Sequence, residues 1–282
     1  MSDPFIFDPS ALLKARYGAG QAAPTATAAA FNPVLATLLA HRSVRAFLPD
    51  ALAAGTLELL VAAAQSAPSS SNLQVWSALA VQDPARRARL ATLVGNQQQL
   101  REAPLFLAWL VDVSRLQRLA AERGQALDGV DYLDTFLMGV IDAALAAQNL
   151  VNAAEALGLG TVYIGALRNQ PEAVAAELGI EAGAGVYPVF GLCVGHPDPA
   201  RPAAVKPRLP QSAVLYRERY APAPVEQEIA GYDEAMRAFY LAQGLPASSW
   251  SAHSLARLRS ADDLKGRHRL REALAGLGFG LR

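Results

Sequence analysis

The stretch DYLDTFLMGVIDAALAAQNLVNAAEAL (131–157) runs directly into GLGTVYIG (158–165), and these two pieces decide the kind of fold. Apolar side chains recur at helical spacing over a broad surface of the first piece, which predicts a helix over 131–157. A helix this long and apolar belongs in a core or at an interface between subunits. Gly158 suits the position just after a helix, and the run that follows it predicts a strand over 160–164.

Further strands and helices are expected on both sides of this pair. The apolar runs that predict strands are 77–81, 105–111 and 186–194. The segments with helical periodicity are 9–17, 34–40, 52–65, 225–241 and 253–277. Few strands among many helices indicate an α+β or α/β protein in which helices cover both faces of one sheet.

Composition limits the classes of protein to consider. The chain has 282 residues, of which 52% are hydrophobic and 18% charged, so it can bury a sizeable core. Its formal net charge is zero, so no overall field attracts nucleic acid or an anionic membrane. The single cysteine, Cys193, excludes an intramolecular disulfide and lies in an apolar run, where we expect a buried thiol.

The N-terminal part differs from the rest. It opens on MSDP, which has no basic or apolar signal region, and the apolar runs are too short for a membrane span; we therefore expect a cytoplasmic protein. An Ala/Thr-rich stretch extends to Ala30, and Pro33 suits the first position of a helix. We expect a flexible N-terminal extension over 1–32 and one folded domain over 33–282, with a helical tail.

Two basic clusters far apart in the chain are the clearest candidates for a site: HRSVR (41–45) and KPRLP (206–210). Lys206 and Arg208 stand two residues apart, so on extended backbone they point the same way. Together with the cations and hydroxyl of 41–45 they could hold one dianionic phosphate. Charge-assisted hydrogen bonds of this kind are each worth roughly 1.5–3 kcal/mol.

Three polar segments have both a structural and a ligand-binding interpretation. SSSNLQ (69–74) follows Pro68 and is either a capped turn or a set of donors to a ligand. GNQQQ (95–99) is either solvated or reads a carbonyl-rich ring. YIGALRN (163–169) is either an ordinary turn or a backbone approach to a flat ligand at Gly165. The basic tail after Arg257 is interrupted by acidic residues, which favours a solvated helical face over nucleic-acid binding.

Several chemistries lack their motifs. No dinucleotide fingerprint follows a strand and no phosphate-loop motif occurs. The four histidines lack metal-site spacing and no nucleophile-elbow motif is present, so we expect neither a metal nor a catalytic side chain. An enzyme with this sequence would leave the chemistry to a bound organic cofactor.

Five segments in this order, HRSVR (41–45), SSSNLQ (69–74), LGLGTVYIG (157–165), FGLCVG (190–195) and KPRLP (206–210), resemble the FMN-dependent nitroreductase superfamily. The chain is most similar to its larger NADPH-dependent nitroreductase and flavin reductase branch, from near Leu35 to near Tyr240. The resemblance implies an α+β fold with a central mixed sheet flanked by helices. It also implies an intertwined homodimer with a C-terminal helical excursion and two FMN sites at the long-helix interface.

The resemblance also implies roles for individual residues. Segments 41–45 and 206–208 would hold the FMN phosphate and ribityl chain, 69–71 would reach across the flavin from the partner subunit, and 164–166 would run along the ring. The implied cofactor-binding residues are His41, Arg42, Ser43, Arg45, Ser69, Ser70, Ser71, Gln97, Ile164, Gly165, Ala166, Lys206 and Arg208. Ala166 replaces a second glycine common in the family, and 244–251 lacks an arginine often found there. The choice between NADPH and NADH therefore stays open.

The activity implied is a ping-pong oxidoreductase that takes a hydride from NAD(P)H onto FMN and passes it to a nitroaromatic, quinone or flavin. Two alternatives stay open at this point. One is a flavin reductase that supplies reduced FMN to a partner monooxygenase, and the other is a non-catalytic FMN-binding protein. Neither nucleic acid nor membrane is an expected partner.

Overall fold

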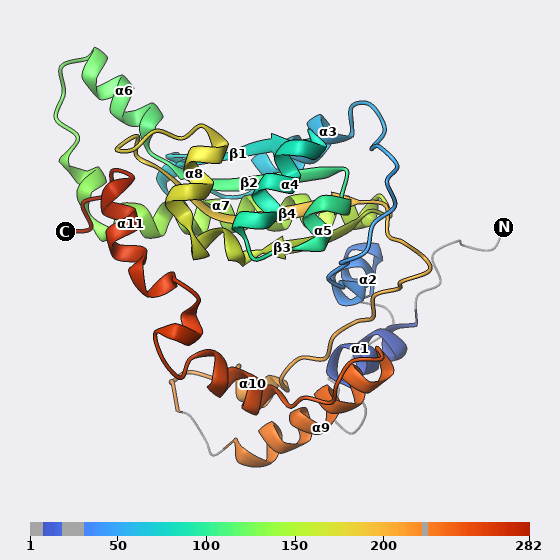
Figure 1. Ribbon diagram of the computed structural model, residues 1–282. Helices are drawn as coiled ribbons and strands as arrows, with labels where there is room; N and C mark the ends of the chain where they lie inside the picture. The colour runs from blue at the N-terminus through green and yellow to red at the C-terminus, as the bar shows by residue number, and fades with distance from the viewer. Residues whose placement is uncertain (1–7, 19–30, 222–224) are drawn as a thin grey trace. The chain divides into compact units, whose positions relative to one another are not determined.

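The computed structural model describes residues 8–18, 31–221 and 225–282 (Figure 1). The chain forms two compact units. Unit 1 consists of Met1–Ser43 and Ala203–Asp263, and unit 2 consists of Val44–Pro202 and Leu264–Arg282. Each unit is therefore built from two pieces of chain that are distant in sequence.

Unit 2 contains a four-stranded sheet. Its strands are β1 (Trp76–Val81), β2 (Leu105–Asp112), β3 (Gly160–Ile164) and β4 (Val186–Gly195), in the spatial order β1-β2-β4-β3. All four lie where the sequence predicts a strand, within one residue at each end. β2 is buried along its whole length because strands and helices cover it on every side. The predicted α+β class is confirmed.

The pairing of the strands differs from the mixed sheet that the resemblance implies. Among the described strands every neighbouring pair is antiparallel. β2 and β3 do run in the same direction, and a helical crossover joins them, as in a parallel arrangement. However, β4 is inserted between them and pairs antiparallel with both. The sequence predicts the helical connection between β2 and β3, but it does not show that β4 lies between these two strands in the sheet.

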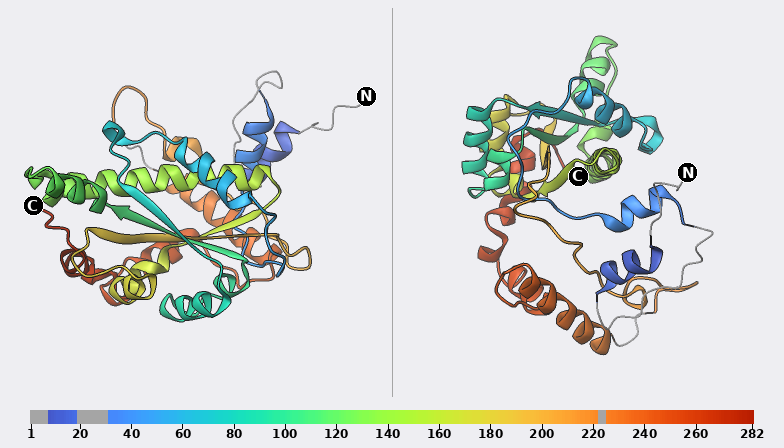
Figure 2. Two further views of the ribbon diagram at one scale, coloured as in Figure 1. Left: turned by 90° about the horizontal axis from the view of Figure 1, so that it is seen from above. Right: turned by 90° about the vertical axis from the view of Figure 1, so that its right-hand side faces the viewer.

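Helices cover both faces of this sheet, as predicted (Figure 2). On one face lie α3 (Thr56–Gln65) and α7 (Leu133–Ala156), and on the other lie α4 (Pro84–Leu93), α5 (Gln98–Glu102) and α8 (Pro171–Leu178). The core under α3 and α7 contains Leu60, Leu107, Trp109, Leu150 and Leu192, of which none is more than 1% exposed. Burying such side chains contributes about 1.5–3 kcal/mol each.

The central helix α7 has two different faces. Toward the sheet it presents small residues, and a Cβ atom at Gly139 would lie only 2.5 Å from Val111 Cγ1. Away from the sheet, a stripe of large apolar side chains stays 40–54% exposed: Leu133, Leu137, Ile141 and Leu145. By length and composition α7 could also cross a membrane, a property that it shares with the core helices of soluble proteins.

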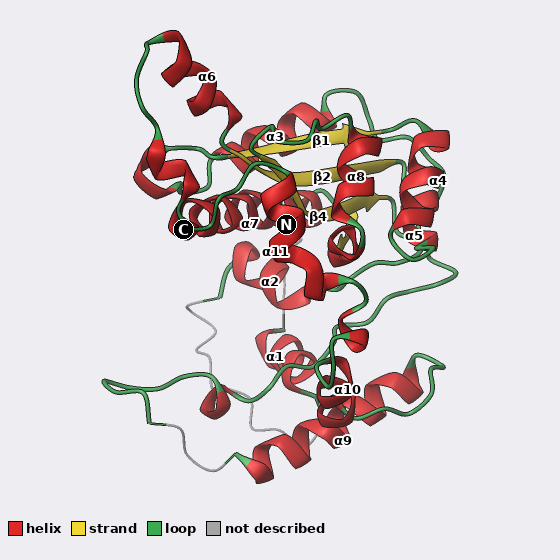
Figure 3. Cartoon of the chain, turned by 60° about the vertical axis from the view of Figure 1, so that its left-hand side comes forward, coloured by secondary structure: helices red, strands yellow, loops and turns green. Residues whose placement is uncertain are grey.

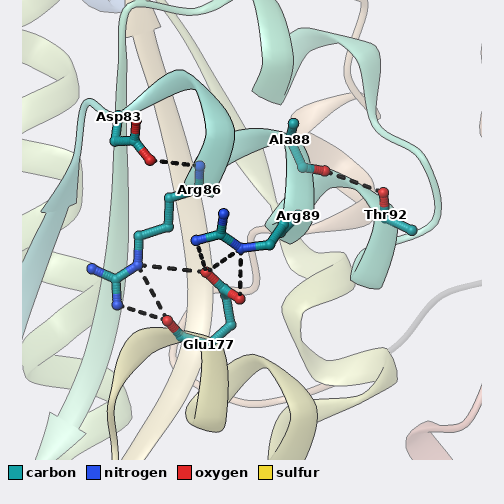
Figure 4. A network of polar contacts seen from close by, with 6 residues as sticks. All are labelled: Asp83, Arg86, Ala88, Arg89, Thr92 and Glu177. Atoms are coloured by element: carbon teal, nitrogen blue, oxygen red, sulfur yellow. Dashed lines mark hydrogen bonds and ion pairs between the residues drawn. The ribbon is translucent and has the colours of Figure 1, made fainter.

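On the face of the sheet opposite to α7, an ion-pair network joins α4 to α8 (Figure 4). Asp83 caps α4 by accepting from the backbone N–H of Arg86 at 2.8 Å. Arg86 donates to the backbone carbonyl of Glu177, and the Arg89 guanidinium grips the Glu177 carboxylate from as close as 2.9 Å. Arg89 holds the pKa of Glu177 below its usual range.

Unit 1 contains four α-helices in its described part: α1 (Pro9–Tyr17), α2 (Pro33–Ala40), α9 (Glu226–Ala242) and α10 (Trp250–Arg257). Asp8 caps α1 and Asn32 caps α2 through side-chain oxygens. α10 lies against α9 (Figure 3), where the rings of Tyr232 and Trp250 are 5.8 Å apart. Of the segment predicted as an N-terminal extension, residues 1–7 and 19–30 lie outside the described residues.

Two helix predictions need correction. The helix predicted over 52–65 begins only at Thr56, because Gly55 has a φ of 79° and ends the preceding turn. The single helix predicted over 253–277 is instead α10, two short 3-10 turns and α11 (Leu270–Gly276). Between them Gly266 has a φ of 85°, and a Cβ there would lie 2.6 Å from the Asn169 carbonyl oxygen. This tertiary contact breaks a segment whose apolar periodicity is continuous.

The remaining described helix is α6 (Ser114–Glu122), which follows β2. Asp112 at the end of β2 accepts hydrogen bonds from Ser114 and Ser77, and it pairs with Arg115 at 3.0 Å. Burial alone would raise the pKa of Asp112, but these hydrogen bonds and the Arg115 charge outweigh it and lower the pKa. The strand therefore ends in a fully satisfied carboxylate.

Candidate functional site

In unit 1 one buried guanidinium joins the two basic clusters. Arg16, at the end of α1, is 8% exposed and donates to the carbonyl oxygens of Leu39 and His41, each at 2.8 Å. Its other terminal nitrogen donates to the Lys206 carbonyl oxygen at 3.1 Å. In return, the backbone N–H of Arg208 donates to the Arg16 carbonyl oxygen at 2.9 Å. Segments 41–43 and 206–208 therefore lie side by side, as their shared chemistry predicts.

Sequence reasoning missed Arg16. It lies in the segment interpreted as a peripheral extension, and nothing in the sequence distinguishes it from any other arginine near the end of an amphipathic helix. The backbone of 206–208 is held further by α9, because the Tyr232 hydroxyl donates to the Pro207 carbonyl oxygen at 3.0 Å.

Three cations of this region, Arg42, Lys206 and Arg208, lack a carboxylate partner in the described part of the chain. Among the described residues the Arg208 guanidinium donates to the carbonyl oxygens of Lys206 and Pro207, at 3.1 and 3.3 Å. The Lys206 ammonium lies 5.4 and 5.1 Å from two aromatic ring centroids, those of Phe239 and Tyr240. Positive charge without an internal counterion fits an anionic group such as a phosphate.

Val44 and Arg45, the last two residues of segment 41–45, belong to unit 2, where Val44 lies against β3. Its backbone N–H donates to the Thr161 carbonyl oxygen at 2.8 Å, beside the start of β3. A Cβ atom at Gly160 would lie 2.8 Å from Val44 Cβ, so only glycine allows this approach. Arg45 is thereby placed next to the strand that ends at Ile164. The order of the motifs in the sequence does not reveal this contact.

The serine loop 69–74 is held by a carboxylate that sequence reasoning also missed. Asp142 on α7 is 1% exposed and accepts from the Ser69 hydroxyl at 2.6 Å and from the Ser70 backbone N–H at 3.0 Å. Ser70 Oγ lies 3.3 Å from Met138 Sδ. No hydrogen bond of the Ser71 side chain occurs in the part of the chain that the structure describes. The three serines are therefore not equivalent, although the sequence suggests that they are.

The other two predicted segments lie at the start of a helix and at the end of a strand. Gln97 precedes α5, and its side-chain oxygen accepts a hydrogen bond from Gln99. Ile164 is 3% exposed, and Gly165 opens a short 3-10 helix that includes Ala166. In the described part of unit 2 no hydrogen bond joins Gln97, the serine loop and 164–166 to one another.

Two guanidinium groups lie beside Gly165. A Cβ atom at this position would be 3.5 Å from Arg168 Nη2 and 3.9 Å from Arg267 Nη2. Arg267 also donates to the Asn169 side chain at 2.9 Å, so this residue of the basic tail does not belong to a solvated face as predicted. The broken helix after α10 explains the error, since it turns Arg267 toward the end of β3.

Two titratable side chains of the sheet, Tyr163 and Cys193, stay protonated and uncharged. Burial raises the pKa of the Tyr163 phenol, which stays protonated and lies 3.4 Å from the Gln148 side-chain oxygen. Cys193 is fully buried, as predicted, and burial raises the pKa of its thiol. A thiol in this state is a poor nucleophile, so Cys193 is a core residue.

The fold of unit 2 is an α+β arrangement around an open antiparallel sheet, and in unit 1 Arg42, Lys206 and Arg208 have no carboxylate partner among the described residues. Comparison with known families identifies the fold. Residues 38–196 match the model described as "Nitroreductase family", and residues 206–282 match "Nitroreductase family, C-terminal domain". The chain belongs to the nitroreductase family.

Similar curated proteins cover most of the chain. An "FMN reductase (NADPH)" of Bacillus subtilis is 40% identical over 67% of this chain and 75% of its own length. An "NADPH-flavin oxidoreductase" of Vibrio harveyi is 36% identical, covering 78% of this chain and 88% of its own. An "Oxygen-insensitive NADPH nitroreductase" of Salmonella typhimurium is 36% identical, with 79% and 89% covered.

Solved structures show the same fold. The NfrA1 nitroreductase from B. subtilis superposes with a TM-score of 0.80 at 34% identity, covering 88% of this chain and 99% of its own. The NADPH:FMN oxidoreductase from V. harveyi, complexed with NAD+, gives a TM-score of 0.77 at 33% identity, with 89% and 100% covered.

Proposed function

We propose that this protein is an FMN-dependent oxidoreductase that takes reducing equivalents from NAD(P)H and passes them to a nitroaromatic, a quinone or a free flavin. The observation that carries the proposal is the cationic cluster of unit 1, where Arg42, Lys206 and Arg208 have no carboxylate partner among the described residues. Relatives named as FMN reductases and NADPH nitroreductases support it. Bound FMN supplies the hydride chemistry that no side chain of the site provides.

The chain's own residues bind and orient. Segments 41–45 and 206–208 hold the phosphate and ribityl chain through charge-assisted hydrogen bonds. Gln97 and the backbone of Ile164, Gly165 and Ala166 face the ring. The guanidinium groups of Arg168 and Arg267 beside Gly165 favour negative charge on a ring placed there. No general acid or base is required of the protein.

The working form in this proposal is a homodimer. The exposed stripe of α7 supports it, because four large apolar side chains at helical spacing on one face call for a covering surface. In the dimer, serine loop 69–74 of one subunit meets the flavin of the other. We expect sedimentation to give twice the mass of one chain, and Ile141→Glu to give a monomer with little bound FMN. A wild-type monomer that retains FMN would contradict this arrangement.

An absorbance experiment tests the activity directly. The purified protein is incubated with FMN, freed of excess, and its spectrum is recorded before and after anaerobic NADPH. We expect the flavin band to bleach, and to return when a quinone or nitroaromatic is added. Protein that takes up no FMN would overturn the proposal. Protein whose FMN is not bleached by NADPH or NADH would instead be the non-catalytic flavin-binding protein considered above.

A flavin reductase is the second candidate, since two of the B. subtilis relatives carry that name. The two activities differ in whether the reduced flavin leaves the protein. Anaerobic ultrafiltration after reduction separates them: reduced FMN in the filtrate indicates a flavin reductase, and reduced FMN retained with the protein indicates the nitroreductase. Both candidates use a nicotinamide donor from the cytoplasm, which is the location we propose.

A further inference from the structure

The loop that connects α3 to β1 adopts an unusual backbone conformation. Within six residues, Ser71, Asn72 and Gln74 have φ angles of 49°, 55° and 52°. This left-handed region is costly for residues other than glycine, and no glycine occurs between residues 66 and 94. Non-glycine residues persist in such a conformation only where the surrounding structure imposes it.

The imposing group is a carboxylate from a different element. Asp142 lies in the middle of α7, 1% exposed, and takes the Ser69 hydroxyl on one oxygen and the Ser70 N–H on the other, at 2.6 and 3.0 Å. In the described part of the chain no lysine or arginine pairs with it. A buried carboxylate that is satisfied only by the loop is expensive, so its retention points to a purpose in the loop.

The direction of the hydrogen bonds explains how one carboxylate closes the loop. An ionised carboxylate only accepts, so the Ser69 hydroxyl must donate to it. The hydroxyl's lone pairs are then free to accept from the Gln74 backbone N–H, which they do at 2.9 Å. One end of the strained stretch is thereby tied to Asp142 directly, through the Ser70 N–H, and the other end is tied to it through the Ser69 hydroxyl.

We infer that Asp142 is a positioning residue that holds loop 69–74 in the conformation in which Ser70 and Ser71 meet the flavin. This inference rests on the proposed function. It assigns the Ser69 hydroxyl to the protein interior, so that the loop contacts the cofactor through the residues after Ser69. It also places the positioning group on the same helix as the exposed apolar stripe of α7.

The test measures FMN affinity by quenching of flavin fluorescence in the full-length protein. Asp142→Asn removes the pure acceptor while keeping shape, and we expect the dissociation constant to rise about tenfold to a hundredfold. Riboflavin affinity should fall by the same factor, because the loop acts apart from the phosphate. Amide exchange over 69–74 should accelerate. Ser69→Ala should cost less in the Asp142→Asn protein than in the wild type, since the two residues share one of the hydrogen bonds that hold the loop.

Unit 1 offers a matched control. Asp233 on α9 is 8% exposed and accepts from the backbone N–H of Ser251 at 2.9 Å and from the Ser251 hydroxyl, the same pattern as at Asp142. Asp233→Asn should change FMN affinity less than twofold. If both variants lose FMN affinity equally, the effect is a general loss of packing and the inference is wrong.

A rescue experiment separates positioning from simple destabilisation. Gln74→Gly makes the left-handed backbone inexpensive at that position, so it should restore part of the FMN affinity of the Asp142→Asn protein. Should Asp142→Asn fail to fold, Ser69→Ala takes its place with the same expectations. Wild-type protein that binds no FMN would defeat the proposed function and this inference together. Wild-type protein that binds FMN, with Asp142→Asn binding it equally well, would defeat this inference alone.

Discussion

Two arginine-rich regions of this molecule use their charge in opposite ways. On α4, Arg86 and Arg89 both engage Glu177 of α8, so their charge is spent on joining two helices. In unit 1, Arg42, Lys206 and Arg208 have no carboxylate partner among the described residues, and they are held by carbonyl oxygens and aromatic rings instead. The ion pairs of Arg86 and Arg89 stabilise the fold, whereas the cations without a carboxylate partner are the ones that we propose bind an anionic ligand.

The largest effect is expected at the residue that assembles the second region. Arg16→Ala removes the guanidinium that donates to the carbonyl oxygens of Leu39, His41 and Lys206, and we expect a loss of about 3 kcal/mol of unfolding free energy. FMN affinity should fall with it, because segments 41–43 and 206–208 are no longer tied. Urea unfolding and fluorescence titration check the two effects. A full-affinity Arg16→Ala protein would show that the clusters meet without the guanidinium.

A second substitution removes ligand-binding charge and leaves the fold intact. Arg208→Ala should weaken FMN binding about tenfold to a hundredfold, and riboflavin binding hardly at all, because the guanidinium acts on the phosphate. The unfolding free energy should stay within about 0.5 kcal/mol of wild type. Arg45→Ala is expected to weaken FMN binding by a similar factor. Equal losses for FMN and riboflavin would contradict the phosphate assignment.

In the network of Arg86, Arg89 and Glu177 a substitution should change stability and leave FMN affinity unaffected. Glu177→Gln should lower the unfolding free energy by no more than about 1 kcal/mol, since the pair is partly exposed, and should leave FMN affinity unchanged. The Arg89 hydrogen bond depresses the pKa of Glu177 in the folded state. This stability is therefore present at neutral pH and is lost as the pH falls through that lowered pKa, on the acid side of an ordinary glutamate. Urea unfolding of both proteins from pH 7 to pH 3 should converge at the acid end.

The smallest effect is expected at an exposed ion pair that forms no hydrogen bond to a predicted site residue in the described part of the chain. Arg259 is 74% exposed and pairs with Asp263 at 3.2 Å. Arg259→Ala should change neither the unfolding free energy by more than about 0.5 kcal/mol nor FMN affinity by more than twofold. A clear loss of FMN affinity would mean that Arg259, like Arg267, takes part in flavin binding.

Local patterns predicted the elements well, because each depends on residues close in sequence. All four strands and α1, α2, α7 and α9 lie within two residues of their predicted bounds. The failures have non-local causes. The tail helix is broken where Gly266 meets the Asn169 carbonyl, and the sheet is antiparallel because β4 enters between β2 and β3.

For the candidate site the division is similar. The cationic and hydroxyl residues of the motifs could be named from the sequence, since phosphate binding demands those residue types. Arg16, Asp142 and Arg267 could not be identified from the sequence. Asp142 and Arg267 contact side chains that are 73 and 98 positions away. Arg16 contacts Lys206, which is 190 positions away, through a backbone carbonyl oxygen that carries no sequence signal. The exceptions are the contacts of Arg16 to Leu39 and His41, which are 23 and 25 positions away.

The sequence by itself determined the class of the fold, the bounds of the central strands and helix, and the residues whose charge and hydroxyl groups suit a phosphorylated cofactor. These follow from periodicity and residue chemistry, which are local. Only the tertiary structure decided which cations remain without a counterion, which serine is committed to a buried carboxylate, and which arginine ties the two basic clusters together. Those outcomes depend on which distant groups arrive within hydrogen-bonding distance, and chain packing alone sets that.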